Sequence, residues 1–190
     1  MKVVYIHGAS ATGDSFNYIR EHLKCKNEHI IEYSSKNGFE NNLAEMKREL
    51  EGDDFLFFVS HSLGGIYSLH LANHFTNRTL GGVSISTPYG GCKEADYAKY
   101  FLPFSQLLRD VGVNSKPITE TRSLKISYPW CNIVTIRGES LWISEPNDGV
   151  VTIASMKSRQ DIELVELPHN HYEVVICQDV VDVIKARLPK

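Results

Sequence analysis

The chain has 190 residues, of which 42% are hydrophobic and 23% charged, and this composition predicts one globular domain over residues 1–190. The formal net charge of −3 argues against nucleic-acid binding, and no apolar run approaches the roughly 20 residues needed to cross a bilayer. The apolar start of the chain ends at Gly8, too early for the core of a signal peptide.

Strand and helix patterns alternate along the whole chain. In chain order they predict a strand over residues 2–6, a helix over 14–24, a strand over 29–33, a helix over 41–50 and a strand over 55–59. A helix over 63–74 follows, then strands over 79–86, 132–137 and 162–167, and a closing helix over 173–188. All five residues of 55–59 are apolar, which is typical of a central parallel strand covered on both faces. This order predicts an α/β fold of three α/β/α layers with a mostly parallel central sheet. Ligand sites in such sheets lie at the carboxyl ends of the strands.

Residues 92–120 belong to the least regular part of the chain and are a candidate for a small flap over the site. The aromatic-rich stretch 97–104, interrupted at Pro103, fits such a flap. It also fits a helix that packs on the core. Both interpretations stay open at the level of sequence.

The four cysteines Cys25, Cys92, Cys131 and Cys177 are widely spaced and include no Cys-x-x-Cys pair. We therefore expect reduced thiols in a cytoplasmic protein, with no metal site.

The segment Ser60-His61-Ser62-Leu63-Gly64-Gly65 lies between the most apolar predicted strand and a predicted helix. A nucleophile elbow has this context, because a sharp strand-to-helix turn lifts a serine hydroxyl above the sheet. The positions two before and two after the serine must be small, since backbones crowd there. Ser62 is therefore a candidate nucleophile, and His61 is expected to point away from it. The alternative is a helix start with an ordinary capping serine.

This segment resembles the elbow of α/β-hydrolase lipases and esterases, whose pattern is Gly-x-Ser-x-Gly. Ser60 departs from the pattern with another small residue. The resemblance implies the α/β-hydrolase fold without a large cap, and a Ser-Asp-His triad in that chain order. It extends to the His7-Gly8-Ala9 loop after the first strand, and implies an oxyanion hole formed by the backbone N–H groups of Ala9 and Leu63.

A serine nucleophile needs a histidine base and a carboxylate that orients it. Asn147-Asp148-Gly149-Val150-Val151 is similar to the segments that carry the triad acid in lipase-like relatives, so Asp148 is the candidate acid. Asn-Asp-Gly is also strong turn chemistry by itself. Glu139 and Glu145 are the alternative acids.

Two histidines follow the last predicted strand, and only one of them can be the base. His171 stands 23 residues after Asp148, a separation that resembles minimal lipases of this family. His171 is therefore favoured over His169.

A weaker candidate lies after the fourth predicted strand. The segment Thr87-Pro88-Tyr89-Gly90-Gly91 resembles a Thr-Pro-x-x-Gly loop of some lipases, which makes Tyr89 a candidate substrate-binding residue in an acyl pocket. A simple turn is the alternative. His70 and His74 are spaced four residues apart but lack the glutamate of a His-Glu-x-x-His zinc site.

Together these residues predict hydrolysis of a small-molecule carboxylic ester through an acyl-enzyme, with no cofactor. The same triad serves thioesterases and amidases. A non-catalytic binding or regulatory protein on this fold is a further alternative. Neither the natural acyl group nor the oligomeric state can be read from the sequence.

Overall fold

Six parallel strands form the central sheet, in the order β2-β1-β3-β4-β5-β6. The strands of this computed structural model, which describes residues 1–101 and 105–189, are β1 (Lys2–Ile6), β2 (Glu28–Ile31), β3 (Leu56–His61), β4 (Thr79–Ile85), β5 (Trp130–Thr135) and β6 (Glu163–Leu167). Every residue of β3 is buried, as predicted for residues 56–59. Phe55, the first residue of the predicted strand, instead lies before β3 and is 52% exposed. The predicted α/β class is confirmed, and each described strand pair is parallel.

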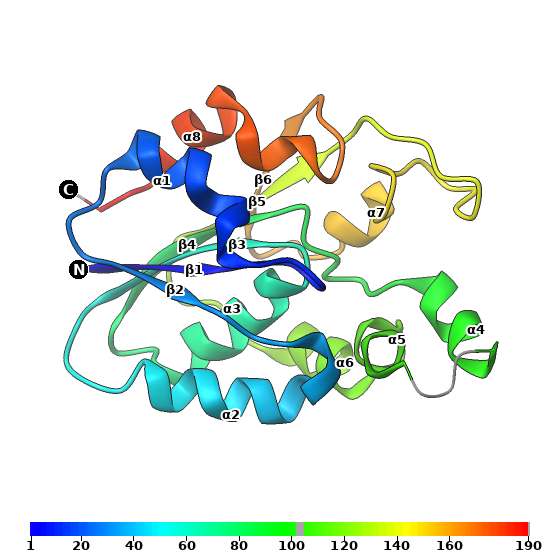
Figure 1. Ribbon diagram of the computed structural model, residues 1–190, viewed down its shortest axis with the longest axis horizontal. Helices are drawn as coiled ribbons and strands as arrows, with labels where there is room; N and C mark the ends of the chain where they lie inside the picture. Colours follow the sequence, from blue (N-terminus) through cyan, green and yellow to red (C-terminus); the bar gives the residue numbers. More distant parts are fainter. Residues whose placement is uncertain (102–104, 190) are drawn as a thin grey trace.

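Helices cover both faces of the sheet (Figure 1). One face carries α1 (Asn17–Leu23) and α8 (Gln178–Lys185), and the other carries α2 (Phe39–Glu49), α3 (Leu63–His74) and α6 (Lys116–Ser123). Successive β3 side chains enter opposite cores because strand side chains alternate. Phe58 packs on the α2 and α3 side, whereas Phe57 packs on the α1 and α8 side.

Three helices lie at the end of the molecule where the strands have their carboxyl ends (Figure 1): α4 (Lys93–Phe101), α5 (Gln106–Val111) and α7 (Ile153–Met156). Residues 92–120 thus contain α4, α5 and the start of α6. The interruption expected at Pro103 lies outside the described residues, as do Phe104 and the side chains of Tyr97, Tyr100 and Phe101.

The single closing helix predicted over residues 173–188 is wrong, because the chain forms a 3₁₀ turn, η3 (Glu173–Ile176), and then α8. Cys177 between them is extended, with φ −108° and ψ 139°. Val175 of η3 and Ile184 of α8 pack into the same core. In one straight helix these two side chains would point to opposite sides, since residues advance about 100° each. The extended Cys177 allows both to be buried. The predicted helix over 14–24 likewise begins as a 3₁₀ turn, η1 (Gly13–Phe16).

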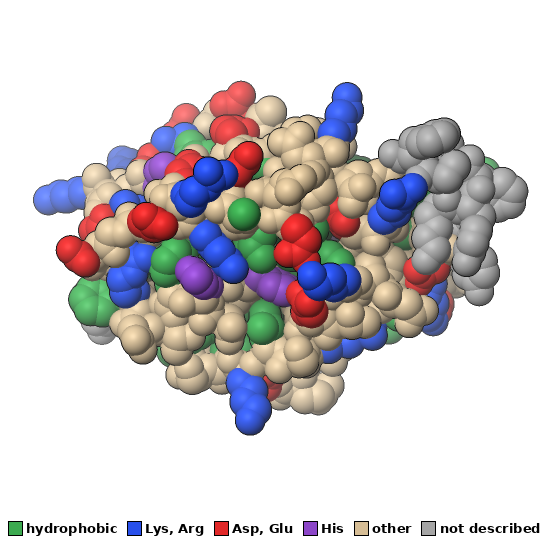
Figure 2. All heavy atoms as spheres, turned by 90° about the horizontal axis from the view of Figure 1, so that it is seen from below, with side chains coloured by type: hydrophobic (Ala, Val, Ile, Leu, Met, Phe, Trp, Pro, Cys, Tyr) green, Lys and Arg blue, Asp and Glu red, His purple; other side chains and the backbone are tan. Residues whose placement is uncertain are grey.

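The surface seen from the α2 side carries acidic and basic side chains mixed together (Figure 2). Within residues 1–101 and 105–189, no helix is long and apolar enough to span a bilayer.

Candidate functional site

Ser62 occupies the sharp turn between β3 and α3, at the carboxyl end of the sheet. Its backbone has φ 53° and ψ −124°, a conformation that costs a non-glycine residue roughly 1–3 kcal/mol. The turn is held by the Ser62 N–H, which donates to the Ile85 carbonyl at 2.8 Å. Gly64 is required here because a Cβ at this position would lie 2.1 Å from the carbonyl oxygen of Ile6. The loop after β1 can therefore pack directly against the elbow.

The departure from the elbow pattern at Ser60 has a structural explanation. The Ser60 hydroxyl is buried and lies 2.9 Å from the Ser68 hydroxyl on α3. A small side chain is kept at this crowded position, and its polar atom has a hydrogen-bonding partner.

Three predicted side chains meet at this turn. The Ser62 Oγ lies 3.0 Å from Nε2 of His171, and Nδ1 of His171 lies 2.7 Å from Oδ2 of Asp148. The His171 backbone N–H also donates to the Asp148 carbonyl at 3.0 Å, so the two loops are joined twice. With Nδ1–H donated to the carboxylate, Nε2 is free to accept the Ser62 proton.

Asp148 is 1% exposed, yet its carboxylate has several donors. Oδ1 accepts the backbone N–H groups of Val150 and Val151 at 3.0 and 2.7 Å, and Oδ2 accepts the Thr135 hydroxyl at 2.5 Å. Burial alone would raise the pKa of Asp148. The hydrogen bonds and charge of His171, together with those from Thr135 and Val151, outweigh burial and hold that pKa below its ordinary value. The carboxylate is therefore ionised at neutral pH.

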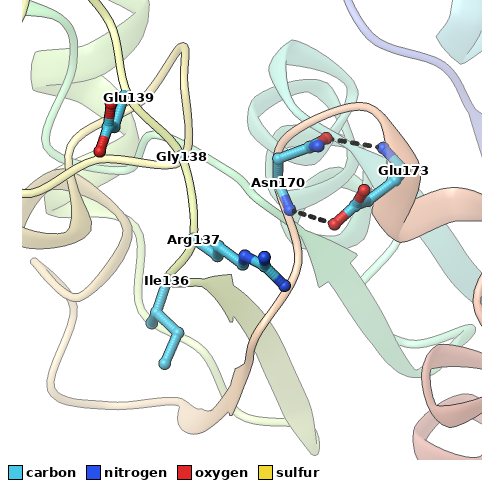
Figure 3. Close-up of a pocket in the computed structure, with 6 residues that line it drawn as sticks. All are labelled: Ile136, Arg137, Gly138, Glu139, Asn170 and Glu173. Atoms are coloured by element: carbon cyan, nitrogen blue, oxygen red, sulfur yellow. Dashed lines mark hydrogen bonds between the residues drawn. The ribbon is translucent and has the colours of Figure 1, made fainter.

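The alternative residues lie elsewhere. His169 turns away from Ser62, and its Nε2 lies 2.7 Å from Oδ2 of Asp179. Glu145 forms an ion pair with Lys93 at 2.6 Å. Glu139 lines a separate hollow of about 560 Å³ beside this site. Figure 3 shows that hollow, with Arg137 and Glu139 from the segment after β5 opposite Asn170 and Glu173 from the segment after β6.

Tyr89 lies in the core rather than in the cavity beside Ser62. Its ring is 0% exposed, its hydroxyl donates to the Ser84 hydroxyl at 2.8 Å, and it accepts the Trp130 indole N–H at 3.0 Å. The neighbouring Pro88 lines the cavity instead. A tyrosine after a strand can thus serve packing as well as binding, and the sequence pattern does not separate the two.

The cavity beside Ser62 has a volume of about 230 Å³ and a mostly apolar lining. Its wall is made by residues from α3, α4, α5 and the segments after β1, β4 and β5: Ala9, Ser62, Leu63, Pro88, Cys92, Glu94, Ala95, Ala98, Leu107, Leu108, Val111, Val150 and Val151. Ala9 and Leu63, the predicted oxyanion-hole residues, thus share one cavity with Ser62.

His61 contacts the site in a way that its sequence position did not predict. It is buried, and its Nε2–H donates to the backbone carbonyl of His171 at 2.9 Å. Burial, reinforced by the nearby His171 ring, lowers the pKa of His61 to about 3, so the ring is neutral at neutral pH. Its partner stands 110 residues away, and no local sequence signal marks the pair.

We expect His61→Ala to lower kcat for the ester hydrolysis predicted from the sequence by about 10- to 100-fold, because the His171 loop loses a buried support. The His171 carbonyl would be left without its donor, which should cost about 1–3 kcal/mol of unfolding free energy. Ester kinetics and thermal unfolding measure the two effects. His61→Gln, which restores a donor, should recover part of both. His74→Ala, at an exposed position on α3, is the control. Equal rates for His61→Ala and the wild type would contradict this role.

No protein-family model matches the sequence, and a comparison with curated proteins finds no significant match. Solved structures do match. A metagenomic carboxyl esterase has a TM-score of 0.71 at 16% identity, over 92% of this chain and 65% of that chain. A lipase-esterase related protein from Clostridium acetobutylicum has a TM-score of 0.70 at 12% identity, over 98% and 94% of the two chains.

The phospholipase PlaB from Legionella pneumophila has a TM-score of 0.76 at 13% identity, over 100% of this chain and 60% of that chain. This chain therefore spans less than two thirds of the carboxyl esterase and of the phospholipase. The α/β-hydrolase fold expected from the sequence is confirmed.

Proposed function

We propose that this protein is a serine hydrolase that cleaves carboxylic esters through an acyl-enzyme intermediate. The observation that carries the proposal is the hydrogen-bonded series from Ser62 through His171 to Asp148 in a cavity with an apolar lining. The esterase and lipase names among the structural neighbours agree with this activity.

In the acylation step, His171 Nε2 takes the Ser62 proton as Oγ forms a bond to the carbonyl carbon of the ester. Asp148 remains ionised and stabilises the imidazolium that results. The carbonyl oxygen gains negative charge, which the backbone N–H groups of Ala9 and Leu63 stabilise. The start of α3 adds a favourable dipole at the same place. His171 then returns its proton to the departing alcohol, and the acyl group stays on Ser62.

In the deacylation step, His171 takes a proton from water, and the resulting hydroxide attacks the acyl carbon. The bond between Ser62 and the acyl group breaks, Ser62 regains a proton from His171, and a carboxylic acid leaves.

The apolar cavity is proposed to hold the acyl chain. A cavity of roughly 150 Å³ accepts a benzene molecule, so about 230 Å³ suits an acyl chain of about six to eight carbons. Each methylene buried contributes about 0.8 kcal/mol, or roughly fourfold in kcat/KM.

We expect kcat/KM for p-nitrophenyl esters to rise about fourfold per methylene from acetate up to about hexanoate or octanoate, and then to level off or fall toward palmitate. Ala98→Phe, which narrows the cavity from α4, should lower kcat/KM for octanoate more than for acetate. A steady rise to palmitate, or no dependence on chain length, would contradict the assignment of this cavity. Absence of hydrolysis across the whole series would contradict the proposed function.

A further inference from the structure

A second cluster of reactive side chains lies where β6 leads into α8. His169, Cys177 and Asp179 each offer a potential ligand atom, and these atoms lie within 4.8 Å of one another. The reaction proposed above uses none of the three. Nitrogen, sulfur and carboxylate oxygen in one place form the kind of donor set that Zn²⁺ prefers in proteins.

The ring of His169 is oriented by a carboxylate. Its Nε2 lies 2.7 Å from Oδ2 of Asp179, and the carboxylate accepts the proton on that nitrogen. In the neutral ring with the proton on Nε2, the lone pair on Nδ1 is available to a ligand. A histidine that binds a metal commonly donates its other N–H to a carboxylate in this way. The His169 side chain is 19% exposed and that of Asp179 is 44% exposed, so solvent ions can reach the cluster.

Nδ1 of His169 faces a thiol and a second carboxylate. Cys177 Sγ lies 3.7 Å from Nδ1, and Glu173 Oε1 lies 3.8 Å from Nδ1. A tetrahedral zinc with Zn–S and Zn–N bonds of about 2.3 and 2.0 Å places those two ligands about 3.5 Å apart. The observed sulfur–nitrogen separation therefore fits an ion with little movement. The Glu173 carboxylate is held by the Asn170 backbone N–H at 3.2 Å (Figure 3).

The extended backbone at Cys177 makes this arrangement possible. It separates η3 from α8, and the Cys177 thiol lies within reach of both His169 Nδ1 and the Glu173 carbonyl, the latter at 3.1 Å. The sequence His169-x-x-x-Glu173-x-x-x-Cys177 thus supplies three donors from one short segment.

We propose that His169 Nδ1 and Cys177 Sγ bind a thiophilic divalent cation, Zn²⁺ being the best match, with Asp179 orienting His169 and the Glu173 carboxylate turning toward the ion as a third ligand. On binding, the S–H bond of Cys177 breaks, a sulfur–metal bond forms, and the proton leaves to solvent. Because His171 lies between these ligands in the chain, the ion ties together the ends of the segment that carries it. Binding to the folded state should therefore raise the melting temperature.

The test uses the full-length protein stripped with a chelator and then titrated with Co²⁺ or Zn²⁺. Co²⁺ should produce a thiolate-to-metal charge-transfer absorption at one equivalent, and calorimetry should show one Zn²⁺ site. Cys177→Ser should abolish the absorption and weaken Zn²⁺ binding at least about tenfold. Asp179→Asn should weaken it about 10- to 100-fold. Cys25→Ser, a partly exposed cysteine outside the cluster, and Ser62→Ala should both bind as the wild type does.

The Ser62→Ala result separates this site from the proposed hydrolase, because that variant should bind the metal without hydrolysing esters. A wild-type protein with no thiolate absorption would overturn the proposal. Cys177→Ser binding Zn²⁺ as tightly as the wild type would also overturn it. So would a loss of Zn²⁺ binding in His171→Ala when Cys177→Ser and Asp179→Asn still bind the metal. If Cys177→Ser does not fold by circular dichroism, Asp179→Asn decides, because that substitution keeps the shape of a half-exposed side chain.

Discussion

Ser62→Ala should lower the hydrolysis of p-nitrophenyl butyrate by about 10⁴- to 10⁶-fold. The alanine removes the only atom proposed to form a covalent bond to the substrate, while the cavity and the oxyanion donors stay in place. The residual rate reports what those donors and water achieve without a nucleophile. The measurement is kcat/KM for the purified variant beside the wild type.

Folding must be preserved for this result to count. Ser62 is on a turn held by its backbone N–H and by the packing of Gly64, and neither depends on the hydroxyl. Circular dichroism and thermal unfolding should therefore match the wild type within about 1 kcal/mol. Ser123→Ala, at an exposed serine near the end of α6, is the matched control and should keep full activity. An unchanged rate in Ser62→Ala would remove Ser62 from the mechanism.

The two histidines after β6 should differ sharply. His171→Ala should lose activity about as severely as Ser62→Ala, because residues of a triad act as a unit. His169→Ala should stay within about tenfold of the wild type, since its ring faces Asp179 and Cys177 rather than Ser62. Both variants are assayed on the same ester, with chelator present so that metal binding at His169 does not contribute.

An inactive His169→Ala variant together with an active His171→Ala variant would reverse the assignment of the base. Loss of activity in both would point to damage of the whole loop, which thermal unfolding of the two variants would reveal. The expected pattern is one inactive and one active variant of similar stability.

Much of the fold was predictable because its signals are local. The apolar run ending at Val59 indicated a buried central strand, and small residues at positions 60 and 64 indicated a sharp turn after it. The structure places a strand, a strained serine and a helix there in that order. The parallel direction of the strands was predicted from the alternation of strand and helix patterns.

Other features depend on contacts that the sequence does not encode. His61 lies beside the candidate nucleophile, but its partner is a backbone carbonyl 110 residues away. The Thr135 hydroxyl, at the end of β5, donates a hydrogen bond to Asp148. Several strands end in a polar residue, so the sequence does not mark Thr135 as a partner of Asp148. Tyr89 resembled a binding-loop residue, and its hydroxyl instead joins Ser84 and Trp130 in the core.

The break at Cys177 was missed for a related reason. Residues 173–188 have helical periodicity overall. The helix is interrupted because Val175 and Ile184 are both buried in the same core, which one straight helix would not allow. The prediction that the chain has no metal site was based on the lack of a cysteine pair and on the spacing of His70 and His74. The cluster proposed here has a single cysteine, brought to His169 by that break.

Covalent labelling with a fluorophosphonate, read by intact mass and peptide mapping, tests most directly whether Ser62 is the nucleophile. The wild type should gain one phosphonyl group, and the adduct should map to Ser62. Ser62→Ala should gain none, and His171→Ala should react far more slowly. An unlabelled wild type, or an adduct on a serine other than Ser62, would contradict the proposed mechanism.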